Sequence, residues 1–208
     1  MNTALMFSSQ SDEWATPQDT FDALDAEFRF GLDAAASTDN AKCHVFLGPG
    51  SDWATDALVE DWSAWTHAGL AVWVNPPYSR GLQAQFIAKA SAESAKGCTV
   101  VMLLPARTDT RAFHAHIWDG DRHAPREGVE VRLIKGRLKF GGCKDAAPFP
   151  SMVVVFRPVV RTMDLCALYG RWHEEGDLAA GITAEALAYE LVSALRQTLA
   201  VLRTELEA

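Results

Sequence analysis

The sequence contains no apolar run of the roughly 20 residues that a membrane-spanning helix needs, although 49% of its 208 residues are hydrophobic. Its first residues lack the basic start and the long apolar stretch of a secretory signal. The four cysteines are scattered without any Cys-x-x-Cys spacing, which argues against a disulfide framework and against a cysteine-rich zinc site. These absences predict a folded cytoplasmic protein with reduced thiols and no membrane partner.

Metal ligands are also few. Three of the six histidines, His114, His116 and His123, lie close together in the sequence, and such spacing occurs in metal sites. Polar histidines on a protein surface are more common, so we expect no bound metal ion.

Basic residues are outnumbered, because 19 lysines and arginines stand against 27 acids and the net charge is -8. Such a charge argues against a protein that binds nucleic acid over its whole surface. From Arg107 to Asp145, however, nine basic residues stand against six acidic ones. This stretch favours a local basic face. A solvated surface of mixed charge explains the same count equally well.

Apolar strands alternate with helical segments along the first 160 residues. The expected strands are residues 28–33, 41–48, 70–77, 98–106 and 149–158, and the expected helices are residues 17–28, 82–96 and 110–120, with a short helix and loop over 52–67. Two of the strands, 70–77 and 98–106, are apolar on both faces and are stopped by proline, which is typical of the interior of a parallel sheet. The alternation predicts an α/β architecture.

The first helix has a recognisable beginning and one apolar side. Thr16 suits the N-cap position, and Pro17 suits the first helical turn. Phe21, Leu24 and Phe28 then recur at helical spacing. These residues predict a short amphipathic helix.

The last third of the chain combines alternation with a leucine stripe. Residues 129–142 alternate and predict a hairpin, or a strand-turn-strand unit, around Lys135-Gly136. After a cap at Thr183, leucines recur at spacings of four and three: Leu187, Leu191, Leu195, Leu199, Leu202 and Leu206. This stripe predicts an amphipathic helix that docks on the core or on a second copy, as a homodimer. We therefore expect a domain over residues 1–160 and a helical extension over 161–208.

An Asn-Pro-Pro-Tyr stretch follows the apolar strand "AVWV" and carries the strongest chemical signal. Pro76 and Pro77 have no N–H, so their carbonyl groups point outward with no donor beside them. Asn75 adds an amide oxygen, and Tyr78 adds a flat ring. Acceptors beside an aromatic ring suit a planar substrate with an NH2 group, whose nitrogen lone pair they can turn toward an electrophile. A proline-rich turn or a polyproline ligand is the alternative, but such a ligand lies on an exposed segment rather than after a buried strand.

Five stretches, in this order, resemble the phage-type (Dam-like) DNA N-6-adenine methyltransferase family. They are "DEWATPQDTFDAL", "FRFGLDAAAS", "VWVNPPYS", "GCTVVMLLPARTDT" and "IKGRLKFGG". The resemblance covers residues 12–157, and the combination is far more specific than Asn-Pro-Pro-Tyr alone. The leucine-rich tail lies outside it.

The resemblance implies a Rossmann-like, S-adenosylmethionine-dependent methyltransferase fold, in which helices flank a mostly parallel central sheet with one reversed strand. Residues 1–160 would be the catalytic domain. The implied cofactor is S-adenosyl-L-methionine, and the implied partner is double-stranded DNA. The implied location is the cytoplasm of the bacterial host of a phage or prophage.

The resemblance also implies a cofactor site at the carboxyl ends of the strands, where open α/β sheets bind ligands. Trp14, Thr16 and Pro17 would line the methionine end of the cofactor. Asp33, which ends the first core strand, would lie near the cofactor's amino group, and Asn75 would touch the cofactor as well.

An acid that binds the ribose hydroxyls is expected further along the chain. Asp52 is the preferred residue, with Asp39 and Asp61 as rivals. One departure concerns the glycine-rich loop that usually follows the first strand and lets the backbone approach the cofactor. Here "DAAAS" replaces it, and alanine is small enough for the same task.

The implied reaction is methyl transfer to the exocyclic N6 amine of adenine, and it requires no metal. The adenine would be flipped out of the duplex, because a paired base cannot present that nitrogen. Asn75 and the carbonyl of Pro76, held beside Pro77, would accept its two N–H bonds. Tyr78 would stack on the base, a contact worth roughly 1–3 kcal/mol.

Contacts with DNA are expected from two further segments. In "GRLKF", Phe140 would face the base, and Arg137 or Lys139 would touch a phosphate or a neighbouring base. The alternative for this segment is a surface hairpin with one core phenylalanine. Arg107 and Arg111 follow a strand end and are candidate phosphate contacts.

Other planar amino groups suit the same tetrapeptide. Protein glutamine side chains and the N2 amine of RNA guanine are therefore alternative substrates, and a non-catalytic DNA-binding module is an alternative of another class. The resemblance outside Asn-Pro-Pro-Tyr favours DNA adenine.

Overall fold

The protein is described by a computed structural model in which residues 14–66, 69–141 and 145–159 are placed. The chain divides at residue 159 into two units, Met1–Val159 and Val160–Ala208, and every described residue belongs to the first. The leucine-stripe helix predicted after Thr183, and with it the predicted dimer contact, lies outside the described residues. Within the described part, no helix is long and apolar enough to cross a membrane.

Six strands form the main sheet, in the order β2-β1-β3-β4-β8-β7. Their bounds are Phe30–Asp33 for β1, Val45–Phe46 for β2, Ala71–Val74 for β3, Val100–Pro105 for β4, Val129–Leu133 for β7 and Ser151–Phe156 for β8. Strands β2, β1, β3 and β4 are mutually parallel, whereas β8 runs antiparallel to both of its neighbours. The predicted α/β class is confirmed, with a mixed, mostly parallel sheet and one reversed strand.

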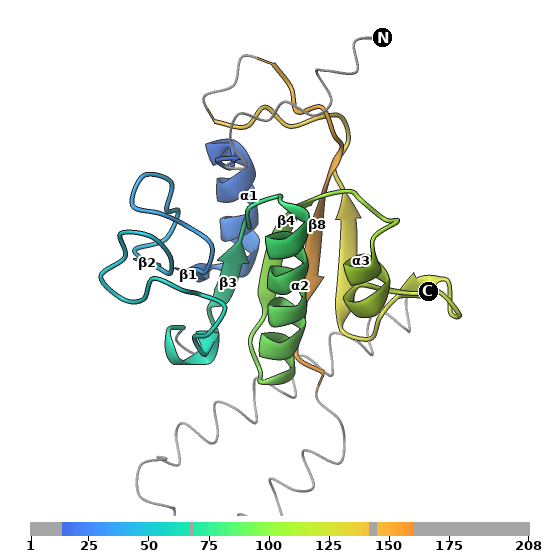
Figure 1. Cartoon of the computed structure of the whole chain (residues 1–208), viewed down its shortest axis with the longest axis horizontal. Coiled ribbons are helices and arrows are strands. Elements are labelled where there is room, and N and C mark those ends of the chain that lie inside the picture. Colours follow the sequence, from blue (N-terminus) through green and yellow to red (C-terminus); the bar gives the residue numbers. More distant parts are fainter. Residues whose placement is uncertain (1–13, 67–68, 142–144, 160–208) are drawn as a thin grey trace, which may run out of the picture. The chain divides into compact units, whose positions relative to one another are not determined.

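Helices cover both faces of this sheet (Figure 1). Helix α1 (Gln18–Phe28) buries Phe21 and Phe28 in a cluster with Trp73 of β3. Helices α2 (Arg80–Ala95) and α3 (Arg111–His116) pack on the opposite face, where they bury Phe86 and Phe113. Successive residues of a strand point to opposite faces, so β3, β4 and β8 are buried along their whole length.

The start of the first helix differs from its prediction. The helix begins at Gln18, Pro17 occupies the N-cap position, and no side chain caps the first turn. Thr16 is therefore not the N-cap. Its side chain is buried, with 4% exposed, because the segment before α1 packs against the sheet instead of running out into solvent.

The hairpin predicted around Lys135-Gly136 is wrong. Strand β7 ends at Leu133 and pairs with β8, which is 18 residues further along the chain at its first residue, Ser151. Gly136 has φ +84, in the left-handed region, and residues 137–141, which directly follow it, are not in a strand. The alternating residues of β7 thus find their partner in a long buried strand rather than in the next few residues.

One element was not expected. A short hairpin of β5 (Trp118–Asp119) and β6 (Ala124–Pro125) stands apart from the main sheet, and its strands are too short for hydrophobic periodicity to reveal. The short helix and loop predicted over residues 52–67 is confirmed over the described residues 52–66, where the helix is a 3-10 turn, η2 (Trp62–Ala64).

Candidate active site

A cavity of about 330 Å³ opens at the carboxyl ends of β1 and β3. Its wall comes from residues within 14–16, 33–42, 47–58 and 73–77, together with Leu82 and Phe86 of α2. Most of this lining is apolar, and the few polar groups come from separate segments. Pockets of this size and character are the usual binding sites of small molecules and cofactors.

Asn75 lies directly after β3 and lines this cavity. Its side-chain nitrogen donates to the backbone carbonyl of Trp14 at 2.5 Å. Its side-chain oxygen accepts a hydrogen bond from the Tyr78 hydroxyl at 2.9 Å. Pro76 and Pro77 also line the cavity, so the structure brings three of the four predicted catalytic residues to one wall.

Tyr78 is not part of the cavity lining, although its hydroxyl group contacts the side chain of Asn75. Its ring is buried, with 4% exposed, and meets Phe140 and Phe149 edge-on at centroid distances of 6.1 and 5.5 Å. Its backbone carbonyl accepts a hydrogen bond from Arg107 at 3.3 Å. The predicted stacking of Tyr78 on a base stays a prediction, because the ring is enclosed by other aromatic rings here.

Asp33 ends β1 inside the cavity wall and is 2% exposed. Its two carboxylate oxygens accept hydrogen bonds from the backbone N–H of Ala35 at 3.2 Å and of Lys42 at 3.0 Å. Burial raises the pKa of Asp33 to about 6, although these two hydrogen bonds and the charge of Lys42 act in the opposite direction. A buried carboxylate held only by backbone donors is suited to a cationic ligand group.

The N-terminal segment completes this wall. Trp14, Ala15 and Thr16 line the cavity, whereas Pro17 does not. The indole ring of Trp14 meets Phe140 and Phe149 edge-on. Two of the three residues predicted for the methionine end of the cofactor are therefore at the cavity.

Asp56 is an acid of the cavity lining that was not among the acids expected from the sequence. Asp56 lines the cavity, and its carboxylate also accepts a hydrogen bond from the Leu58 N–H at 3.0 Å. Asp39, Asp52 and Asp56 are all exposed, but of the three only Asp56 is part of the lining. Asp61 caps η2 and pairs with Lys96 at 3.2 Å. Asp56 belongs to the same acidic stretch as Asp52. The path of the loop decides that Asp56 lines the cavity and Asp52 does not.

The loop after β1 approaches a second loop through a glycine. Ala35, Ala36 and Ser37 line the cavity, and Gly48 lies opposite with φ +144. A Cβ atom at Gly48 would lie 1.9 Å from the carbonyl oxygen of Ala36. Gly48 thus lets this loop pack directly against the backbone of the loop after β1, and the Gly48-Pro49-Gly50 stretch was the signal for it in the sequence.

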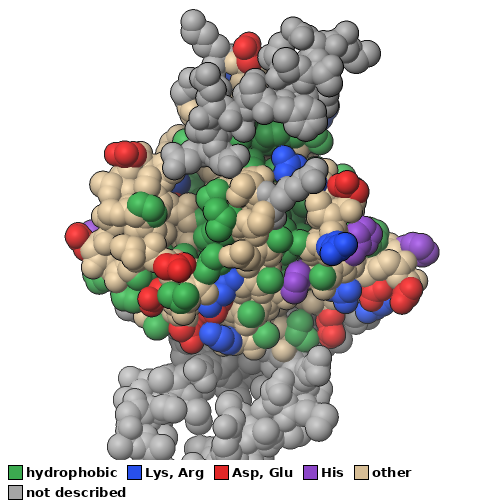
Figure 2. Space-filling view, in the orientation of Figure 1, with side chains coloured by type: hydrophobic (Ala, Val, Ile, Leu, Met, Phe, Trp, Pro, Cys, Tyr) green, Lys and Arg blue, Asp and Glu red, His purple; other side chains and the backbone are tan. Residues whose placement is uncertain are grey.

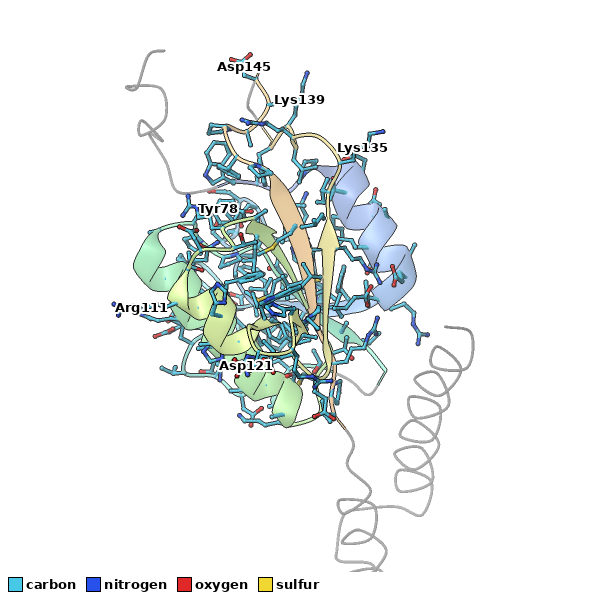
Figure 3. The ribbon with its side chains drawn as sticks, turned by 90° about the vertical axis from the view of Figure 1, so that its right-hand side faces the viewer. Tyr78, Arg111, Asp121, Lys135, Lys139 and Asp145 are labelled. Atoms are coloured by element: carbon cyan, nitrogen blue, oxygen red, sulfur yellow. The ribbon has the colours of Figure 1, made fainter. Side chains whose placement is uncertain are left out.

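The predicted DNA-binding residues are distributed over two places. Arg137 and Lys139 are exposed on the segment that follows β7, and Arg111 is exposed at the start of α3. Figure 3 shows Lys139 above Tyr78 and Arg111 below it. Arg137 donates to the carbonyl of Ala147 at 3.3 Å. Phe140 is 1% exposed and belongs to the aromatic cluster, so in this structure it is a core residue.

The three clustered histidines come from α3 and the neighbouring hairpin, and Figure 2 shows histidine side chains at the surface in that region. His114 and His123 are exposed, and His116 is half-buried. In the described part of the chain, no three His, Cys, Asp or Glu residues are grouped in a way that could hold a metal ion.

The fold and the cavity define an α/β protein with a pocket at the carboxyl ends of its strands, and Asn75 lines that pocket. Comparison of the sequence identifies the family. The family model described as "DNA N-6-adenine-methyltransferase (Dam)" matches residues 4–172. The chain belongs to this family.

Two phage proteins, both called DNA N-6-adenine-methyltransferase, are similar to the chain. The protein of Haemophilus phage HP1 (strain HP1c1) is 30% identical over 169 residues, which are 80% of this chain and 90% of the phage protein. The protein of Escherichia phage T1 is 35% identical over 103 residues, which are 49% of this chain and 39% of the phage protein. No solved structure matches the chain significantly.

Proposed function

We propose that the protein transfers a methyl group from S-adenosyl-L-methionine to the N6 amine of a flipped adenine at specific sites in double-stranded DNA. The observation that carries this proposal is the cavity wall that joins Asn75 and its two prolines to the buried carboxylate of Asp33. Membership of the DNA N-6-adenine-methyltransferase family supports the choice of reaction and substrate.

The fold supports the same assignment. The sheet order β2-β1-β3-β4-β8-β7, with β8 reversed, is consistent with a Rossmann-like methyltransferase domain over residues 1–160. We assign residues 161–208 to an amphipathic helical extension that packs on the core or on a second copy. Both relatives are phage proteins, so the expected place of action is the cytoplasm of a bacterial host.

The residues at the cavity fit the cofactor. When bound, S-adenosyl-L-methionine supplies an electrophilic methyl group on a sulfonium centre. Asp33 would hold the ammonium of its methionine end, with Trp14 and Thr16 beside it. Asp56, rather than Asp52, would accept the ribose hydroxyls, because Asp56 lines the cavity and Asp52 does not.

The acceptor amine would be oriented by oxygen atoms. The side-chain oxygen of Asn75 and the carbonyl of Pro76 would accept its two N–H bonds, so that the nitrogen lone pair faces the cavity. The two prolines fix this geometry, because each restricts its own φ angle. Orientation of this kind supplies a large part of the rate enhancement of a two-substrate reaction.

DNA would reach this end of the sheet along basic residues. Arg137 and Lys139 are exposed beside it, and we assign them to phosphate contacts together with Arg107 and Arg111. Contacts of this kind position the duplex without reading its sequence.

The proposal is tested by incubating the purified chain with tritium-labelled S-adenosyl-L-methionine and, separately, duplex DNA, RNA or protein. Label is expected in DNA alone, and after digestion it should be found in N6-methyladenine. Label in protein glutamine or in RNA guanine would replace the proposed substrate with another planar amino group. Label in no polymer, with retained DNA binding, would indicate a non-catalytic module.

Cofactor binding should depend on pH through Asp33. Its pKa of about 6 means that the carboxylate, which the ammonium group needs, is lost as the pH falls through 6. The Kd for S-adenosyl-L-methionine should therefore rise about tenfold for each pH unit below 6. Calorimetric titration between pH 5 and pH 8 measures this slope.

The same pKa has the opposite consequence for folding. Because the folded-state pKa lies above the ordinary value of 3.8, protonation of Asp33 favours the folded state. That contribution to stability is complete below pH 3.8 and is lost as the pH rises through 6. Weaker cofactor binding in acid would thus not come from unfolding driven by Asp33. The Asp33→Asn variant should bind S-adenosyl-L-methionine weakly, and its Kd should not change with pH below 6. If the Kd of Asp33→Asn rose with falling pH as steeply as that of the wild type, Asp33 would not be the group that holds the cofactor's ammonium.

A further inference from the structure

The carboxamide of Asn75 is held from two sides at once. Its nitrogen donates to the Trp14 carbonyl at 2.5 Å, and its oxygen accepts from the Tyr78 hydroxyl at 2.9 Å. Turning the carboxamide over would place its oxygen against the carbonyl oxygen of Trp14, where both atoms are acceptors. The two contacts therefore select one of the two orientations.

Only that orientation is chemically useful in the proposed reaction. An exocyclic amine presents N–H donors, so it must meet an acceptor. The reversed carboxamide would present its own NH2 group, and donor would face donor. The oxygen of Asn75 has two lone pairs, and the Tyr78 hydroxyl uses one of them. The other is free to face a substrate amine.

Tyr78 is built into the core rather than offered to a ligand. Its ring is 4% exposed, and its hydroxyl also reaches the Leu103 carbonyl of β4, at 3.4 Å. Burial raises the pKa of Tyr78, so the hydroxyl keeps its proton and remains a donor. To stack on a base, the ring would have to leave Phe140 and Phe149 and break its contact with Asn75.

We propose that Tyr78 acts through its hydroxyl, as a positioning residue that fixes the Asn75 carboxamide with its oxygen available to the substrate amine. This inference rests on the proposed function and departs from the stacking role that the motif suggests. It assigns the rate effect of Tyr78 to one O–H group and not to the face of its ring.

Tyr78→Phe separates the two roles, because it removes the hydroxyl and keeps the ring. We expect kcat for DNA methylation to fall ~10-fold or more, which corresponds to the loss of one hydrogen bond. The KM values for DNA and for S-adenosyl-L-methionine should stay within about twofold of wild type, since Phe preserves the packing. Steady-state kinetics with labelled cofactor measure both quantities.

Ser151→Ala is the matched control. It also removes a buried hydroxyl from the sheet, and Ser151 is 1% exposed with no hydrogen-bond partner for its side chain in the described structure. Its kcat should equal that of wild type. Thermal unfolding of both variants shows whether a loss of rate accompanies a loss of fold.

A second background tests whether Tyr78 acts through Asn75. In Asn75→Asp both polar atoms of the side chain are oxygens, so no orientation has to be selected. One of them faces the Trp14 carbonyl, where both atoms are acceptors, so kcat of this variant is expected to be below that of wild type and is the reference for the double variant. Adding Tyr78→Phe to Asn75→Asp should therefore lower kcat much less than it lowers kcat in the wild type, and this non-additivity is the signature of a shared role.

Three outcomes would overturn the inference. One is a Tyr78→Phe variant with wild-type kcat, as expected of a stacking ring. A second is a rise in the KM for DNA without a change in kcat. The third is an equal loss of kcat in both backgrounds. Failure of the proposed function looks different, because the wild-type chain would then transfer no label to DNA.

Discussion

Asn75→Ala is expected to lower methyl transfer to DNA at least ~100-fold, the scale on which a directly contacting polar group affects catalysis. The substitution removes the oxygen that accepts the amine proton and leaves the amine free to turn. Binding of S-adenosyl-L-methionine should change only a few fold, because Asp33 and the N-terminal segment still line the cavity. Labelled methyl transfer and calorimetry measure the two effects separately.

Ser79→Ala is a suitable control for this variant. Ser79 follows the same motif at the N-cap of α2, and its side chain makes no capping hydrogen bond. It should therefore leave both transfer and cofactor binding unchanged. An Asn75→Ala chain with full turnover would remove Asn75 from the reaction, whereas loss of cofactor binding together with turnover would show that Asn75 mainly supports the cavity.

The strands that position Asn75 were readable from the sequence. Strands β3 and β4 are short runs of apolar residues stopped by proline, and burial on both faces requires that composition. The prolines mark where each strand ends, so the residues at the carboxyl ends of these strands could be predicted. The partner of β7 was not, because pairing between distant strands leaves no local pattern.

The same distinction holds for the site. Asp33, Asn75 and Thr16 were predicted as site residues, and all three line the cavity. Asp33 and Asn75 could be predicted to meet because they lie at the ends of neighbouring strands. Thr16 was predicted only because it belongs to a motif of the family. Asp56 was missed in favour of Asp52, since both are acids of one loop and only its path decides which faces the cavity. The burial of Phe140 depends on contacts with Trp14 and Tyr78, which lie far from it along the chain.

Gly48→Ala should be among the most damaging substitutions at the cavity. With φ +144, the backbone of Gly48 is in a region that L side chains rarely adopt, and an added Cβ would lie 1.9 Å from the Ala36 carbonyl oxygen. That neighbour is backbone, so no side chain can move to relieve the contact. We expect a loss of ~2 kcal/mol or more in the free energy of unfolding.

The damage should extend to ligand binding, because Gly48 and Ala36 form facing parts of the same cavity wall. Separation of the two loops would displace Asp33 from Asp56, and the affinity for S-adenosyl-L-methionine should fall at least ~10-fold. Gly120→Ala is the control, since a Cβ there meets no atom within 4 Å and its φ is not in the left-handed region; its stability should change by no more than about 0.5 kcal/mol. Urea unfolding and calorimetry compare the two variants. If Gly48→Ala had the same free energy of unfolding and the same affinity for S-adenosyl-L-methionine as Gly120→Ala, the close contact between Gly48 and Ala36 would be contradicted.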